Sequence, residues 1–133
     1  MTERTEWSFV EIFNGDHRCT VEITSGSDTK LVVQLFTELF DLVKAKGVKD
    51  ESQVEVVASL TTNQLQQNQP LAIAVSALRT GLIMLAAQAK SMTLTEYLGG
   101  ESKLNVPLYA NINRCLLGNH RTPRDFGNAA ERA

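Results

Sequence analysis

The stretch that follows Pro70 constrains the fold of this chain more than any other part of the sequence. It reads LAIAVSALRTGLIMLAAQAK, and apolar residues occupy nearly every side of the helix that it predicts. Four polar residues interrupt it: Ser76, Arg79, Thr80 and Gln88. A helix that is apolar nearly all round is buried on most sides, so other elements must surround it. Gly81, near its middle, predicts that another backbone approaches the helix closely.

The overall composition excludes some partners. The formal charge is −2 and the pI is about 5.7, so we expect no general attraction to nucleic acid or to anionic membranes. The long apolar stretch carries Arg79 and falls short of the roughly 20 apolar residues of a membrane span, which favours a core helix and no membrane partner. The two cysteines, Cys19 and Cys115, lie far apart and form no CxxC pair. Since no secretory leader precedes them, we expect reduced thiols and a cytoplasmic protein.

Two short segments ahead of this helix predict a β-hairpin. WSFVEIF and RCTVEIT both alternate, and they are separated by NGDH, in which Asn-Gly is the strongest short-range hairpin signal. One face of the first strand carries Trp7, Phe9, Glu11 and Phe13, and the other carries Ser8, Val10 and Ile12. Neither face is cleanly polar, so we expect both to be partly covered.

Helices are predicted between the hairpin and the apolar stretch. SDTKLVVQLFTELFDLVKAKG has apolar residues at helical spacing, with Ser27 or Asp28 as the expected N-cap and Gly47 as the end. A weaker helix opens at Asp50 and is expected to fade in the polar stretch TTNQLQQNQ.

The part of the chain after the apolar stretch predicts a short helix, a strand and a further helix. Thr93 and Glu96 form a capping box, residues 106–112 alternate as in a buried strand, and Thr122 with Pro123 is typical of a helix start. The predicted fold class is therefore α+β: an antiparallel hairpin or meander, a helical bundle, and then one βα unit. A lone βα unit needs neighbouring strands and a covering helix layer, so we expect this one to be the start of a larger sheet.

The order of these elements resembles the enolase superfamily, in its mandelate racemase and muconate lactonizing branch. In that branch an alanine-rich helix leads to a short helix with a Leu-Gly-Gly turn, and then to a first barrel strand of the type VPLYAN. Here these features are residues 72–89, residues 98–100 and residues 106–111. The resemblance implies a capping domain over residues 1–103 and the first βα unit of an incomplete (β/α)8 barrel over residues 104–133.

The chain departs from this family where the family does its chemistry. The family's acid/base lysine, its three magnesium-binding carboxylates and its late histidine or lysine lie on later barrel strands, which this chain does not contain. The Gly-Trp-Gly-Glu signature of the second strand is reduced to CTVEIT, which keeps only Glu22. We therefore expect no catalytic residue, no metal ligand and no activity in this chain alone. A complete member would be a magnesium-dependent lyase or isomerase resembling acid-sugar dehydratases and racemases.

Three residues at the end of the predicted barrel strand are candidate substrate contacts: Asn111, Asn113 and Arg114. The resemblance places them at the carboxyl end of the strand, where barrel enzymes bind substrate, and Arg114 could pair with a carboxylate. The competing interpretation is that both asparagines satisfy the backbone of a turn and that Arg114 is solvated.

The hairpin loop also has two interpretations. It consists of Asn14, Gly15, Asp16 and His17. The resemblance implies a lid, because a mobile loop of the family's capping domain closes over the barrel mouth and helps to select the substrate. The simpler interpretation is a tight turn in which Asn-Gly supplies positive φ angles.

A different class of function is open as well. The chain could be a stand-alone α+β interaction module that forms a homodimer through its helical face and the predicted C-terminal strand. Exposed apolar residues on that strand favour self-association under either hypothesis. The expected partners are therefore a second copy of the chain and, for a capping domain, a barrel domain.

Overall fold

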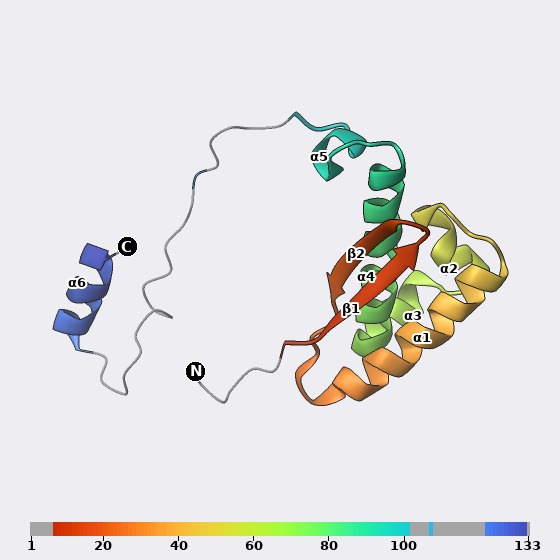
Figure 1. Cartoon of the computed structure of the whole chain (residues 1–133). Coiled ribbons are helices and arrows are strands. Elements are labelled where there is room, and N and C mark those ends of the chain that lie inside the picture. Colours follow the sequence, from red (N-terminus) through yellow and green to blue (C-terminus); the bar gives the residue numbers. More distant parts are fainter. Residues whose placement is uncertain (1–6, 102–106, 108–121, 133) are drawn as a thin grey trace. The chain divides into compact units, whose positions relative to one another are not determined.

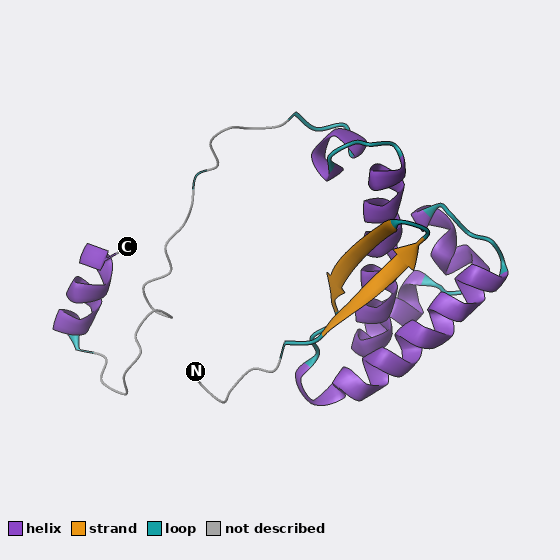
Figure 2. Cartoon of the chain, viewed as in Figure 1, coloured by secondary structure: helices purple, strands orange, loops and turns teal. Residues whose placement is uncertain are grey.

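The fold is α+β, as predicted from the sequence, and it begins with an antiparallel hairpin followed by helices (Figures 1 and 2). The computed structural model describes residues 7–101, residue 107 and residues 122–132. The chain divides into two compact units, Met1–Glu101 and Ser102–Ala133, which are described separately. The larger unit contains β1 (Phe9–Asn14), β2 (His17–Glu22), α1 (Thr29–Ala45), α2 (Val54–Val57), α3 (Thr62–Gln67), α4 (Gln69–Ala89) and α5 (Leu94–Tyr97). Short 3₁₀ turns, Gly26–Asp28 and Glu51–Gln53, precede α1 and α2.

The two strands form a regular antiparallel hairpin that is closed by a tight turn. The register pairs Asn14 with His17, so that Gly15 and Asp16 form a two-residue loop. Gly15 has φ +60°, while Asp16 is not among the residues with positive φ. This pattern matches a type II′ turn, in which glycine takes the first central position, and such turns fit the natural twist of paired strands. The predicted hairpin is therefore confirmed, but only Gly15 has the positive φ expected of the Asn-Gly pair, because Asn14 is the last residue of β1.

The hydrophobic core lies where α4 meets α1 and the inner face of the hairpin. Ile12, Cys19 and Val21 point inward from the two strands and are buried, and Leu78 of α4 is fully buried. α1 and β2 are the principal neighbours of α4 in this unit (Figure 2). The long apolar helix is thus surrounded on several sides, as its composition requires.

Gly81 allows a close approach, but the approaching group is not the one predicted. A side chain at this position of α4 would collide with the Cδ1 atom of Ile12 and would lie 3.6 Å from the Sγ atom of Cys19. The Cys19 thiol also donates a hydrogen bond of 3.5 Å to the Gly81 carbonyl oxygen. The expectation of a neighbouring backbone was wrong, because the hairpin inserts side chains rather than its main chain at this point.

The two faces of the hairpin differ more than the sequence predicted. The face that carries Val10 and Ile12 packs on the core, whereas Phe9 and Phe13 on the other face are exposed. The expectation that both faces are partly covered was therefore wrong for the described residues. The second strand explains why one face of the hairpin is buried and the other is exposed. Its apolar residues lie on the inner side, and the register places Val10 and Ile12 of the first strand on that same side.

Helix starts were predicted with mixed success. Asp28 occupies the N-cap position of α1, yet its side chain makes no capping hydrogen bond, and Ser27 lies inside the preceding 3₁₀ turn. The expected side-chain cap of α1 was therefore wrong, because this turn leads directly into the helix. By contrast, Asp50 does cap its turn, since its Oδ1 atom accepts a 2.9 Å hydrogen bond from the Ser52 amide.

The polar stretch after α2 contains a helix that the sequence analysis missed. α3 begins with a capping box in which the Thr61 hydroxyl accepts from the Gln64 amide and the Gln64 side chain accepts from the Thr61 amide. The predicted capping box of α5 is confirmed in the same form, with Thr93 and Glu96 as its members.

The smaller unit contains one described helix, α6 (Pro123–Arg132). It starts where the sequence predicts, because the Thr122 hydroxyl accepts a hydrogen bond of 3.3 Å from the Asp125 amide. Asp125 Oδ2 in turn accepts from the Thr122 amide at 2.9 Å. The predicted strand over residues 106–112 lies outside the described residues except for Pro107.

α4 is the one helix in the described ranges that is long and apolar enough to cross a membrane by length and composition. A core helix passes the same test. In this fold α4 lies against α1 and β2, and 39% of its most apolar window is buried inside the unit.

Candidate functional site

The residues proposed as site residues from the sequence fall in two places. The loop residues Asn14, Gly15 and Asp16 are exposed and His17 is half-buried, and together they form the hairpin turn. The candidate substrate contacts Asn111, Asn113 and Arg114 lie outside the described residues. The structure therefore does not bring the two sets together in one described site.

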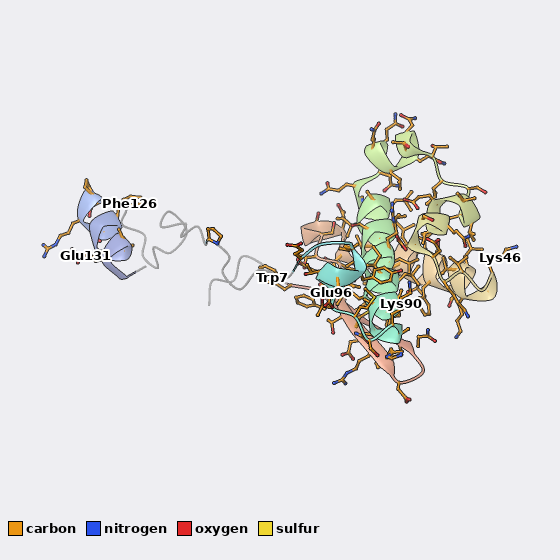
Figure 3. The ribbon with its side chains drawn as sticks, turned by 90° about the horizontal axis from the view of Figure 1, so that it is seen from above. Trp7, Lys46, Lys90, Glu96, Phe126 and Glu131 are labelled. Atoms are coloured by element: carbon orange, nitrogen blue, oxygen red, sulfur yellow. The ribbon has the colours of Figure 1, made fainter. Side chains whose placement is uncertain are left out.

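A cluster of exposed aromatic side chains is the most prominent surface feature of the larger unit. Trp7, Phe9 and Phe13 are 63%, 55% and 60% exposed, and we call this surface the aromatic face. The rings of Trp7 and Phe9 are stacked, with centroids 6.5 Å apart and planes inclined by 14°. Trp7 lies at the margin of the unit in Figure 3. Exposed aromatic clusters of this kind mark surfaces that bind another molecule.

Charged residues border the aromatic face on the neighbouring strand. The register places Arg18 opposite Phe13 and Glu22 opposite Phe9, with Thr20 opposite Glu11 between them. All of these side chains are exposed. Aromatic residues beside a charged and polar border are typical of protein–protein interfaces, where aromatic side chains anchor the contact and polar groups orient it.

A groove lies between β2 and α4, beside the aromatic face. It has a volume of about 430 Å³. Its lining comes from one strand and one helix: Val21, Glu22, Gln69, Ala72, Ile73, Ser76, Ala77 and Thr80. Most of the helix residues are small, which leaves room for side chains of a bound molecule.

A second hollow of about 340 Å³ lies on the side of α4 that faces α2 and α3. Arg79 and Glu55 line it and form an ion pair, with 2.7 Å between the Arg79 Nη1 and Glu55 Oε1 atoms. The two side chains are 42% and 22% exposed, so solvent weakens this pair and we expect it to contribute at most about 1 kcal/mol. Its clearest role is to fix α2 against α4.

Two findings concern metal-ligating and nucleophilic side chains in the described ranges. Among them, no group of three or more histidine, cysteine, aspartate and glutamate side chains is placed to hold a metal ion. Burial raises the pKa of the Cys19 thiol above 9.0, and a hydrogen bond from the Ile12 backbone opposes this only in part. At neutral pH this thiol is protonated and is a poor nucleophile.

The raised pKa of Cys19 predicts a pH dependence of stability. In the folded state the thiol holds its proton more tightly than in the unfolded chain, so its contribution is complete below the unfolded pKa. That contribution is lost as the pH rises through the folded pKa, which lies above 9.0. We expect the urea midpoint of the wild type to fall more between neutral pH and pH about 10 than that of Cys19→Val, whose side chain does not titrate. Equal falls in the two proteins would contradict this assignment.

Comparisons with family models, with curated proteins and with solved structures found no match to this chain.

Sequence reasoning identified the aromatic residues but not their role. Trp7, Phe9 and Phe13 were placed on one face, and that face was expected to be partly covered. The signal that would have separated the faces is the second strand, in which Cys19 and Val21 alternate with exposed polar residues. The groove beside β2 had no signal in the sequence, because it is lined by a strand and a helix that lie far apart along the chain.

Proposed function

We propose that residues 7–101 form a non-catalytic capping domain that docks on a (β/α)8 barrel of the enolase-superfamily type. The aromatic face is the observation that carries this proposal, because it gives the unit a binding surface built from side chains that a free domain would normally bury. The order of elements, a hairpin followed by a helical unit, agrees with the resemblance described above.

In this proposal the capping domain contributes shape and selectivity, and the barrel contributes chemistry. Magnesium and the catalytic side chains would belong to the barrel. The hairpin turn at Asn14–His17 lies at one end of the strands that carry the aromatic face, so docking through this face would hold the turn at the border of the interface. Asn111, Asn113 and Arg114 would add substrate contacts from the first barrel strand.

The test is binding to a barrel supplied as a separate chain. The full chain is mixed with the isolated barrel of a magnesium-dependent acid-sugar dehydratase from which the capping domain has been removed, and complex formation is followed by sedimentation velocity. We expect a one-to-one complex with the wild type. The double substitution F9S/F13S removes two exposed aromatic anchors and should weaken binding about 100-fold or more.

A matched control uses two exposed apolar residues on α1. Leu31 and Val33 are 45% and 42% exposed, so the double substitution L31S/V33S removes exposed apolar side chains elsewhere on the unit. It should leave the complex intact. Failure of the wild-type chain to bind the barrel, or equal losses in both double variants, would count against the capping-domain proposal.

The second candidate function is a homodimeric interaction module, and the exposed residues of α1 favour it. Leu31 and Val33 are exposed apolar residues of α1, and their two-residue spacing places them on different sides of the helix. If the chain dimerises in the absence of a barrel, and if L31S/V33S rather than F9S/F13S prevents this, the module hypothesis takes precedence.

A further inference from the structure

The outer edge of β2, together with the groove beside it, has the properties of a strand-binding site. We propose that this edge binds an extended peptide segment of another protein chain, which adds to the hairpin as a third strand. The segment carries apolar side chains at alternate positions and a lysine or arginine beside Glu22. This site adjoins the aromatic face along Thr20 and Glu22, but it uses the backbone edge of β2 and the groove, and it does not depend on the proposed capping function.

The backbone of β2 determines which groups are available. The Ile23 amide donates a 2.9 Å hydrogen bond to the Ser8 carbonyl oxygen, and the register continues as Val10 with Val21. In an antiparallel pair, hydrogen-bonded pairs alternate with pairs whose N–H and C=O groups point away from the partner strand. The groups of Thr20 and Glu22 therefore point to the outer edge of β2.

The outward N–H and C=O groups lack hydrogen-bond partners among the described residues only at the end of β2 that lies away from the turn. Near the turn, the Gln88 side chain of α4 donates a 2.8 Å hydrogen bond to the Arg18 carbonyl oxygen and so covers the edge there. Within the described ranges, no hydrogen bond is made by the outward backbone groups of Thr20 and Glu22. Two residues with one N–H and one C=O each leave four groups for a new strand, and their alternate spacing fits an extended backbone.

The groove supplies the side-chain contacts that a third strand needs. A strand added at the edge of a sheet directs every second side chain toward the layer below, which here is α4. α4 forms the floor of the groove. Most of its residues there are small, among them Ala72, Ser76 and Ala77. Larger residues at these positions of α4 would fill the groove, whose volume of about 430 Å³ is otherwise open to a guest strand. The floor therefore leaves room for apolar side chains of the bound segment.

The charge of Glu22 determines where a basic residue of the bound segment lies along the groove. Glu22 is the one charged residue that lines the groove, and it lies at the end where the backbone groups are free. A lysine or arginine in the bound segment can pair with it, whereas an acidic residue would be repelled. The edge also lacks the lysine or proline that usually protects an exposed strand from pairing.

The test is a titration of the nitrogen-15-labelled full chain with a short acetylated peptide of alternating valine and threonine that contains one lysine. We expect amide exchange at Thr20 and Glu22 to slow at least about tenfold at saturation, because their N–H groups become hydrogen-bonded. The amide of Glu11 points to the opposite edge of the hairpin and should not change. A peptide with glutamate in place of lysine should bind about fivefold more weakly, and Glu22→Lys should reverse this preference.

A matched pair of variants tests the groove itself. Ser76 and Asp41 are both exposed helical residues, but only Ser76 lines the groove. Ser76→Phe should abolish protection by the peptide, and Asp41→Phe on α1 should leave it unchanged. Absence of protection in the wild type, equal protection at Glu11, or full binding by the Ser76→Phe variant would each overturn the proposal.

Discussion

Replacing Leu78 with alanine is expected to lower the free energy of unfolding by about 3–5 kcal/mol. Leu78 is fully buried in α4, where α1 and the hairpin meet the helix, so truncation removes apolar contacts on more than one side. A cavity at such a position closes poorly, because the surrounding elements are held by their own contacts with α4. Urea denaturation at neutral pH measures the effect.

The control for this substitution is a leucine of the same size on the surface. Leu31 of α1 is 45% exposed, and its replacement with alanine should cost less than about 1 kcal/mol. A similar loss in both variants would mean that α4 is not the centre of the core. Unchanged m-values would show that the comparison reflects the folded state rather than a change in the unfolded chain.

Replacing Gly81 with valine is expected to cost about 1–3 kcal/mol, because it overpacks the contact between α4 and the hairpin and forces the end of the Ile12 side chain to shift. The first carbon of any new side chain collides with the Cδ1 atom of Ile12, and valine adds two further methyl groups beside Cys19. The helix offers no alternative direction for these atoms, since the side-chain position is fixed by the backbone. Thermal and urea denaturation should both show the loss.

A double-mutant cycle shows whether the collision is the cause. Alanine is favoured over glycine within a helix by about 1 kcal/mol, so Gly81→Ala combines a gain in helix propensity with the cost of the collision. Ile12→Val removes the Cδ1 atom that would collide. In that background Gly81→Ala should stabilise the protein by about 1 kcal/mol. The same effect of Gly81→Ala in both backgrounds would contradict the proposed contact.

The sequence was informative wherever a local signal decided the structure. The hairpin follows from a glycine turn between two alternating segments, and α5 and α6 begin at the threonines that cap them. The same kind of signal was present but unused at Thr61, where a threonine three residues before a glutamine starts α3. Predictions failed at the hairpin faces, because the choice between them depends on the register and on the position of α4 rather than on the first strand.

The candidate site was harder to predict than the fold, for a physical reason. A residue type indicates that a side chain is apolar, but its exposure depends on which elements cover it. Phe9 and Ile12 both fit a buried strand by sequence, and only packing separates an exposed aromatic residue from a core residue. The groove at β2 likewise lies between a strand and a helix that are far apart along the chain, so only the folded structure brings its lining together.

The central place of α4 has a consequence for how the larger unit can change. Both strands, α1, α2, α3 and α5 all touch this one helix. A peripheral element such as α5 can therefore detach from α4 by itself while the rest of the unit stays folded. Insertions or substitutions in such an element disturb only its contact with α4. α4 itself can be released only when the sheet and α1 separate from it together. The unit is thus cooperative at its centre, where the hairpin and α4 also carry both proposed binding surfaces, and it opens more readily at its border.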